Sequence, residues 1–291
     1  DYLIVQHLEP DHAGTIARVM ALYPEMQVVA SDKAVKMMPQ FFFETQFEGR
    51  VIGVKEGGTL SLGGRTLHFA MAPMVHWPEV MVTYDSCDKV LFSADGFGKF
   101  GALCYTEDEW ACEARRYYFN ICGKYGAPVQ QALKKLGGLD IKRVCSTHGP
   151  VWEKNISEVI DLYDKMSRCE VERGVCIVYA SMYGNTAAAA DALAMELEEL
   201  GVPYAIHDLA GNNAGELGIS GALRDVFKYD TIVVGAPTYN NGIFPPAETF
   251  MKALQARLIK GRRFYAFGSY TWAGASVRLL NEMAASLNFE L

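Results

Sequence analysis

Hydrophobic residues in the first half of the chain recur mainly in short runs of strand length. The apolar run 2–5 leads into a cluster of polar residues, and 27–30 has the same strand-like character. Between them, 14–22 has the spacing of a helix. Several further runs are separated by Gly-Gly and Asp turns between residues 50 and 93: VIGV, TLSL, RTLHFAM, VMVTY and KVLFS. The pattern predicts a β-rich first half with one early helix.

The helical pattern becomes dominant after residue 105. It predicts helices within 106–136 and over 156–168, with a short strand over 141–145 between them. Three acidic residues occupy the first turn of the earlier helical segment, where the helix dipole favours negative charge. These residues are Glu107, Asp108 and Glu109.

The rhythm changes after residue 174 to a regular alternation of strands and helices. The predicted strands are 175–180, 204–208, 231–236 and 263–268, and the predicted helices are 186–200, 222–227, 247–258 and 275–287. Strands that alternate with helices of this length form a parallel sheet covered on both faces. The chain is therefore predicted to be α/β, with two domains over residues 1–170 and 173–291.

Composition narrows the class of protein. The net charge of −7 and the lack of any Lys/Arg-rich run argue against a nucleic-acid partner, which requires a basic face. The longest apolar runs are too short to span a membrane, and no segment has the form of a signal peptide. Seven scattered cysteines without a CxxC pair are typical of reduced thiols. We therefore expect a cytoplasmic protein.

A dense group of metal-ligand side chains follows the first apolar run. His7, Glu9, Asp11 and His12 lie within six residues, in the pattern HxExDH. Further candidates, each at or just after the end of a predicted strand, are His76, Asp95 and His148. Imidazoles supply neutral nitrogen ligands and a carboxylate can bridge two cations, so the group suits a dinuclear centre.

This order of ligands resembles the metallo-β-lactamase fold, whose hydrolases carry HxHxDH followed by His, Asp and His. Position 9 is Glu where the zinc hydrolases carry His, and this variant resembles the flavodiiron proteins. A carboxylate makes the site more anionic, which suits iron better than tetrahedral zinc. The resemblance implies one iron on His7, Glu9 and His76, and a second on Asp11, His12 and His148, with Asp95 as the bridge. It leaves open whether His12 and His76 both bind iron.

A second set of motifs lies in loops after the predicted strands of the second half. The loop 181–186 combines hydroxyls with backbone N–H groups at a helix N-terminus, which makes an anion site, and it resembles the phosphate loop of flavodoxins. Two later loops, APTYNNG and FGSYTWAG, offer aromatic faces and small residues for a flat ring, and they resemble the FMN loops of flavodiiron proteins. The predicted FMN contacts are Ser181, Met182, Tyr183, Gly184, Asn185, Thr186, Pro237, Thr238, Tyr239, Asn240, Asn241, Gly242, Ser269, Tyr270, Thr271, Trp272 and Gly274. Asn185 and Thr271 depart from the residues usual in that family.

The resemblance implies a metallo-β-lactamase-like αββα domain followed by a flavodoxin-like, doubly wound parallel sheet. We expect the first domain to be truncated at its N-terminus and the second at its C-terminus, where a fifth strand is missing. The implied activity passes electrons from rubredoxin or a similar donor, through FMN, to a non-haem diiron centre that reduces O₂ to water or NO to N₂O. The implied assembly is a head-to-tail homodimer or a dimer-based tetramer.

Two other functions remain open from the sequence. A metallo-β-lactamase-fold hydrolase with a flavodoxin-like appendage would use the same ligands to bind zinc. An electron-transfer flavoprotein would use the first domain only as a docking scaffold. The preference between O₂ and NO and the identity of the electron donor are not encoded in these motifs.

Overall fold

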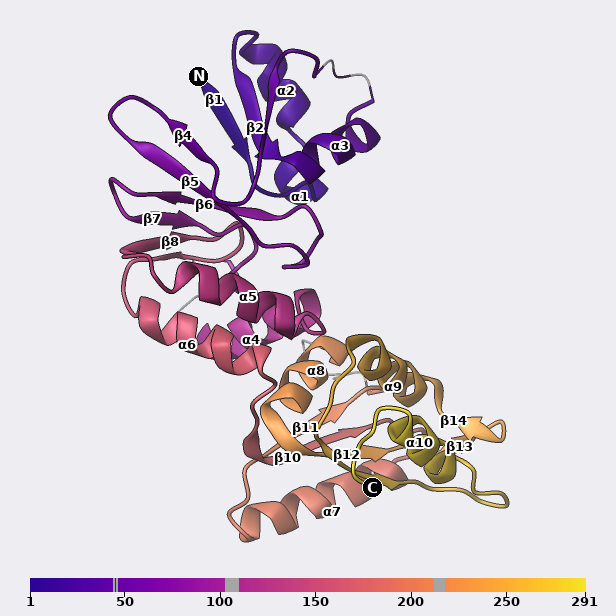
Figure 1. Cartoon of the computed structure of the whole chain (residues 1–291). Coiled ribbons are helices and arrows are strands. Elements are labelled where there is room, and N and C mark those ends of the chain that lie inside the picture. Colours follow the sequence, from indigo (N-terminus) through magenta and orange to yellow (C-terminus); the bar gives the residue numbers. More distant parts are fainter. Residues whose placement is uncertain (44, 46, 103–109, 212–217) are drawn as a thin grey trace. The chain divides into compact units, whose positions relative to one another are not determined.

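The computed structural model describes residues 1–43, 45, 47–102, 110–211 and 218–291. The chain divides into two compact units, Asp1–Arg168 and Cys169–Leu291 (Figure 1).

The first unit contains two sheets. The first sheet is parallel, in the order β1-β2-β3, with strands Tyr2–Val5, Gln27–Ser31 and Val51–Val54. The second has the order β4-β5-β6-β7-β8-β9. Its strands are Thr59–Ser61, Thr66–Met71, Met81–Asp85, Val90–Phe92, Arg143–Cys145 and Val151–Trp152. Most neighbours in this sheet are antiparallel, but β7 and β8 are parallel.

The two sheets face each other across an apolar layer. Val29 of β2 and Val54 of β3 pack with Leu67 and Phe69 of β5 and Met81 of β6. All five residues of β6 and four of the five residues of β2 are buried, so neither strand has a face open to solvent.

Helices cover the outer faces of both sheets. α1 (Pro10–Ala13), α2 (Ile16–Leu22) and α3 (Asp32–Phe41) lie on the first sheet and share its outer core. α4 (Trp110–Ile121), α5 (Gly126–Leu136) and α6 (Ile156–Ser167) lie on the other side of the unit (Figure 1). The predicted αββα arrangement is thereby confirmed.

The predicted helical stretch 106–136 is two helices, α4 and α5, with a break at 122–125. The acidic first turn predicted at Glu107, Asp108 and Glu109 lies outside the described residues. Helix α3 and strand β9 were not predicted.

The second unit is a four-stranded parallel sheet in the order β11-β10-β12-β15. Its strands are β10 (Glu172–Tyr179), β11 (Tyr204–Asp208), β12 (Tyr229–Gly235) and β15 (Arg263–Phe267). The helices are α7 (Asn185–Glu199), α8 (Gly218–Lys228), α9 (Pro245–Arg257) and α10 (Ser276–Ala285). A small antiparallel hairpin, β13 (Thr238–Tyr239) and β14 (Gly242–Ile243), follows β12.

The two faces of this sheet are covered by different helices. Ile177 and Tyr179 of β10 pack with Ala190 and Ala194 of α7. Cys176, on the other face of β10, lies 3.9 Å from the carbonyl oxygen of Ala222 in α8. Helices on both faces of a parallel sheet make the doubly wound arrangement that the alternating pattern predicted (Figure 1).

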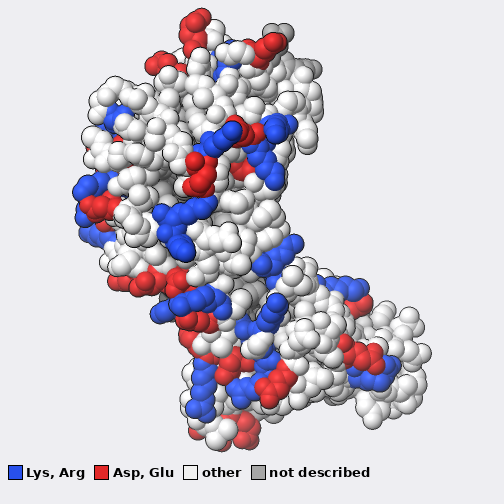
Figure 2. All heavy atoms as spheres, viewed as in Figure 1, with Lys and Arg blue, Asp and Glu red and all other residues white. Residues whose placement is uncertain are grey.

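The surface carries charges of both signs. On the face shown in Figure 2, basic and acidic side chains are interspersed over both units. Within the described part of the chain, no helix is long and apolar enough to cross a bilayer.

Candidate metal centre and flavin crevice

The HxExDH motif spans a change of backbone conformation directly after β1. Glu9 has extended dihedral angles (φ −60°, ψ 135°) and is the N-cap of the one-turn helix α1. Pro10 lies in the first turn of α1. Backbone N–H groups of a first turn have no hydrogen-bond partner within the helix, so proline, which lacks an N–H, is tolerated there. Asp11 and His12 follow on the helix. The four ligand-type residues are thus held by one strand end and one helical turn.

The other three candidates follow strands of the second sheet. His76 lies between β5 and β6, Asp95 follows β7, and His148 lies between β8 and β9. Since β6 is antiparallel to both β5 and β7, and β8 is parallel to β7, the three strands β5, β7 and β8 run in the same direction. Their carboxyl ends therefore bring these three residues to one edge of the sheet.

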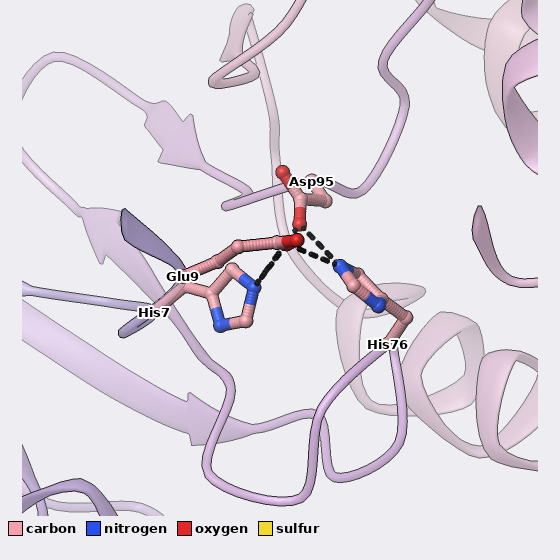
Figure 3. Close-up of side chains that lie close together, drawn as sticks. All are labelled: His7, Glu9, His76 and Asp95. Carbon is pink, nitrogen blue, oxygen red and sulfur yellow. Dashed lines mark hydrogen bonds and ion pairs between the residues drawn. The ribbon is translucent and has the colours of Figure 1, made fainter. Parts of the chain in front are cut away.

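Four of the seven candidates form a first cluster, shown in Figure 3. Glu9 Oε2 lies 2.9 Å from His76 Nε2 and 3.3 Å from His7 Nε2. Asp95 Oδ2 lies 3.1 Å from His76 Nε2 and 3.4 Å from His7 Nε2. Two imidazole nitrogens and two carboxylate oxygens therefore point toward a common centre.

The remaining three candidates form a second cluster on the other side of Asp95. His148 Nε2 lies 3.0 Å from Asp11 Oδ2, and His12 Nε2 lies 3.5 Å from Asp11 Oδ1. Asp95 Oδ1 lies 3.0 Å from His12 Nε2 and 3.6 Å from His148 Nε2. The two oxygens of Asp95 thus face different clusters, which is the geometry of a carboxylate that bridges two cations.

Unsatisfied polar atoms test whether these clusters fit metal ions. Asp95 Oδ2 and His12 Nε2 are buried and have no hydrogen-bond partner of suitable geometry within the described part of the chain. A buried polar group left unpaired costs about 1–3 kcal/mol, so such atoms are rare unless something else satisfies them. Four imidazoles and three carboxylates suit first-row transition-metal ions and not Mg²⁺ or Ca²⁺, which prefer oxygen ligands throughout. The residues fit two divalent transition-metal ions.

Asp95 is held in its ionised form. Burial alone would raise the pKa of its carboxyl, but the nearby imidazoles of His12 and His76 and the hydrogen bond from Thr147 outweigh that effect and hold the pKa well below its usual range. Thr147 Oγ1 donates to Asp95 Oδ1 over 2.7 Å. An ionised carboxylate is the form that binds cations.

Two neighbours of the clusters were not anticipated from the sequence. Thr147 precedes His148 and holds Asp95, and Glu79 accepts a hydrogen bond from His7 Nδ1 over 2.7 Å. The only signal in the sequence was their position within the motifs that contain His76 and His148.

The other two histidines lie away from these clusters. His68 is exposed on β5 with its ring centroid 6.4 Å from that of Tyr84. His207 on β11 pairs with Asp225 of α8, with Nε2 and Oδ2 2.9 Å apart.

The predicted flavin loops lie at the carboxyl ends of the second unit's strands. The chain moves from β10 to β11 on one side and to β12 on the other, so a crevice is expected between the ends of β10 and β12. A cavity of about 630 Å³ is present there. Its lining includes twelve of the predicted residues: Met182, Tyr183, Asn185, Pro237, Thr238, Tyr239, Asn240, Asn241, Ser269, Tyr270, Thr271 and Trp272.

Five predicted contact residues do not line this cavity: Ser181, Gly184, Thr186, Gly242 and Gly274. Ala273, which was not predicted, does line it. Ser181 and Gly184 shape the first loop instead, because the backbone N–H of Gly184 donates to Ser181 Oγ over 3.1 Å and Gly184 has φ 89°. Thr186 Oγ1 lies 3.1 Å from Ser269 Oγ and so links the first loop to the third.

Large aromatic side chains stand exposed around the cavity. Tyr183 is 86% exposed, Tyr270 is 67% exposed and Trp272 is 88% exposed. Exposed aromatic faces beside a cavity and next to the N-terminus of α7 suit a ligand that combines a flat ring system with a phosphate.

Comparison with known families assigns both units. The family described as ODP family beta lactamase matches residues 1–149, and the Flavodoxin family matches residues 177–291.

Individual relatives align with the whole length of this chain. An uncharacterized protein of Methanocaldococcus jannaschii is 30% identical over 296 residues, which cover all of this chain and 73% of that protein. The anaerobic nitric oxide reductase flavorubredoxin of Salmonella arizonae is 30% identical over 304 residues, and the chain spans only 62% of its length.

Solved structures with the same fold cover the whole of this chain. Rubredoxin oxygen:oxidoreductase from Desulfovibrio gigas superimposes with a TM-score of 0.90 at 28% identity, over all of this chain and 73% of that one. The flavodiiron protein from Giardia intestinalis gives 0.89 at 26% identity, over all of this chain and 72% of that one. The chain therefore belongs to the flavodiiron protein family.

Proposed function

We propose that this chain is the catalytic core of a flavodiiron oxidoreductase. It passes electrons from a redox partner, through FMN, to a non-haem diiron centre that reduces O₂ to water, NO to N₂O, or both. Residues 1–170 and 173–291 act as its diiron and flavin domains. When bound, FMN interconverts two-electron and one-electron transfer, and two ferrous ions can jointly deliver electrons to a diatomic molecule.

The observation that carries this proposal is the arrangement around Asp95. Its two oxygens face two clusters of imidazole and carboxylate groups, which fits a pair of metal ions that share one bridging ligand. Glu9 makes the first cluster richer in oxygen than a zinc hydrolase site, because it replaces an imidazole with a carboxylate.

The proposed ligands divide between the clusters. His7, Glu9 and His76 would hold one iron, Asp95 would be shared between the two irons, and the second cluster would hold the other. The ligands of the second iron are Asp11, His12 and His148. These seven residues are also the proposed catalytic residues.

The second unit supplies the proposed flavin site. The N-terminus of α7 and the hydroxyl-bearing loop before it favour the FMN phosphate. Tyr239, Tyr270 and Trp272 surround the cavity with aromatic surface for the ring system. Thr238 Oγ1 accepts hydrogen bonds from the backbone N–H groups of Ala275 and Ser276, which keeps the second and third loops together before any ligand binds.

Metal and flavin analysis of the purified chain tests the proposal. We expect about two irons and one FMN per chain, followed by consumption of O₂ or NO after anaerobic reduction. Two zinc ions without iron would favour the hydrolase instead. Gas consumption that survives the double substitution Glu9→Ala and Asp95→Ala would overturn the diiron assignment and favour an electron-transfer flavoprotein.

The partner and the assembly are part of the same proposal. The named relatives are a flavorubredoxin and a rubredoxin oxygen:oxidoreductase, which supports rubredoxin or a similar small redox protein as the electron donor. We further propose a head-to-tail homodimer or a dimer-based tetramer that works in the cytoplasm. Light scattering measures the assembly, and a titration with reduced rubredoxin tests the donor.

A further inference from the structure

Glu79 lies behind the first metal cluster and contacts the ligand loop of the first sheet. It is 1% exposed, and its carboxylate is entirely buried. Glu79 Oε1 accepts a hydrogen bond from His7 Nδ1 over 2.7 Å and a second from the backbone N–H of Leu8 over 3.1 Å. One carboxylate oxygen therefore fixes both the ring of His7 and the peptide that leads to Glu9.

The contact determines which nitrogen of His7 faces the cluster. When Nδ1 carries the proton that it donates to Glu79, Nε2 keeps its lone pair free. That free nitrogen is the atom that lies near Glu9 and Asp95. The opposite tautomer would place a proton where a metal ligand is needed.

The segment that carries Glu79 also contributes to the cluster directly. Within four residues, His76 supplies a cluster nitrogen, Trp77 packs edge-on against the ring of His7 at 5.1 Å and 88°, and Glu79 holds the far side of that ring. Ser31 Oγ donates to the backbone carbonyl of Glu79 over 2.7 Å, which ties the segment to the first sheet. This short loop therefore joins the two sheets at the cluster.

We propose that Glu79 is a positioning residue for the metal centre, which holds His7 in the tautomer and orientation that bind iron. The role rests on the proposed diiron function. Carboxylates that orient a metal-bound imidazole commonly change metal affinity by roughly 10–100-fold. The charge on Glu79 strengthens its hydrogen bond to His7 and makes the imidazole a better donor to a cation.

The test compares Glu79→Gln and Glu79→Ala with the unaltered chain. Fe(II) affinity is measured anaerobically by competition with a chelator, and bound Co(II) is measured by its visible absorption as a probe of ligand geometry. Glu79→Gln keeps the size and one acceptor oxygen but removes the charge, so we expect a folded protein with Fe(II) binding weakened roughly 10-fold and a changed Co(II) spectrum. We expect Glu79→Ala to bind Fe(II) roughly 100-fold more weakly than the unaltered chain, at the upper end of the range for orienting carboxylates.

Asp85→Asn is the matched control. Asp85 lies on β6, the strand that follows Glu79, and its carboxylate is also buried, with the residue 4% exposed. It pairs with Arg65 and not with a residue of either cluster. We expect this variant to bind Fe(II) and Co(II) as the unaltered chain does.

Each remaining outcome has a definite meaning. Equal Fe(II) affinity and identical Co(II) spectra for the unaltered chain and folded Glu79→Gln would overturn the positioning role while leaving the diiron function intact. An unaltered chain that binds no iron would overturn the proposed function first. Loss of Fe(II) affinity in Asp85→Asn equal to that in Glu79→Gln would show that any buried charge matters and would also overturn the role.

Discussion

Replacing Asp225 with Asn should destabilise the second unit in a way that depends on pH. Asp225 is 5% exposed on α8. It receives hydrogen bonds from His207 of β11 over 2.9 Å and from Arg224 over 2.9 and 2.7 Å. Burial alone would raise the pKa of its carboxyl, but these hydrogen bonds and the charge of Arg224 lower it from 3.8 to about 2.

The magnitude follows from linkage. A decrease from 3.8 to about 2 corresponds to about 2 kcal/mol of stability that the ionised carboxylate contributes. The pKa of the folded state is lower than that of the unfolded state. The contribution is therefore complete above about pH 4 and is lost as the pH falls toward 2. Asp225→Asn should thus cost about 2 kcal/mol at pH 7, and its difference from the unaltered chain should shrink between pH 4 and 2.

The assay must resolve one unit of a chain that has two, because a single melting temperature does not describe such a protein. Native-state hydrogen exchange of peptides from β10, β11 and α8 gives the free energy of opening locally, and peptides of the first unit serve as the internal reference. Glu282→Gln is the control variant, since Glu282 pairs with Arg278 on the exposed surface of α10 and should contribute less than about 1 kcal/mol. Equal protection of Asp225→Asn and the unaltered chain at pH 7, or a difference that stays constant down to pH 2, would refute the reasoning.

Three further changes test the two sites. Glu9→His creates the HxHxDH pattern of the zinc hydrolases and should raise the ratio of zinc to iron in the purified chain. Elemental analysis measures this ratio, and an unchanged ratio would show that Glu9 does not favour iron. Gly268→Ala places a Cβ 2.4 Å from the carbonyl oxygen of Ala236, so it should force two flavin loops apart at a cost of about 1–3 kcal/mol in stability. FMN binding should weaken with it in a fluorescence titration, and unaltered affinity would contradict that. Thr147→Val removes the hydrogen bond to Asp95 and should cost about 1.5–3 kcal/mol in the stability of the metal-free first unit, as measured by hydrogen exchange of peptides from that unit. A cost below about 0.5 kcal/mol would show that Asp95 finds another donor.

Sequence periodicity predicted most of the strands, because the burial of a strand requires a run or an alternation of apolar residues within the strand itself. The alternation of strands and helices after residue 174 predicted all four strands of the parallel sheet. The central strands β10 and β12 have the long apolar runs of strands buried on both faces, whereas the edge strands β11 and β15 keep exposed positions. Helix α3 was missed although Ala34, Met38 and Phe41 follow helical spacing and pack on one core, because Pro39 lies inside it and proline usually ends or kinks a helix. Its start is set by Ser31, whose side chain accepts from the backbone N–H of Ala34 over 3.1 Å, a capping contact that is hard to distinguish from a turn in the sequence.

The clusters show where prediction from motifs ends. Ligand types and their order were readable because a strand end followed by His, Asp or Glu is a local signal, and the parallel course of β5, β7 and β8 brings such ends together. The contacts that orient those ligands join residues far apart in the chain. His7 and Glu79 are separated by 72 positions, and Asp95 and Thr147 by 52. Hydrophobic periodicity does not encode such pairs, because the local pattern around each residue predicts its own strand or loop whether or not the distant partner is present. The contact between His7 and Glu79 forms only when the two sheets pack, and the contact between Asp95 and Thr147 forms only when β7 and β8 pair, so neither follows from the sequence pattern.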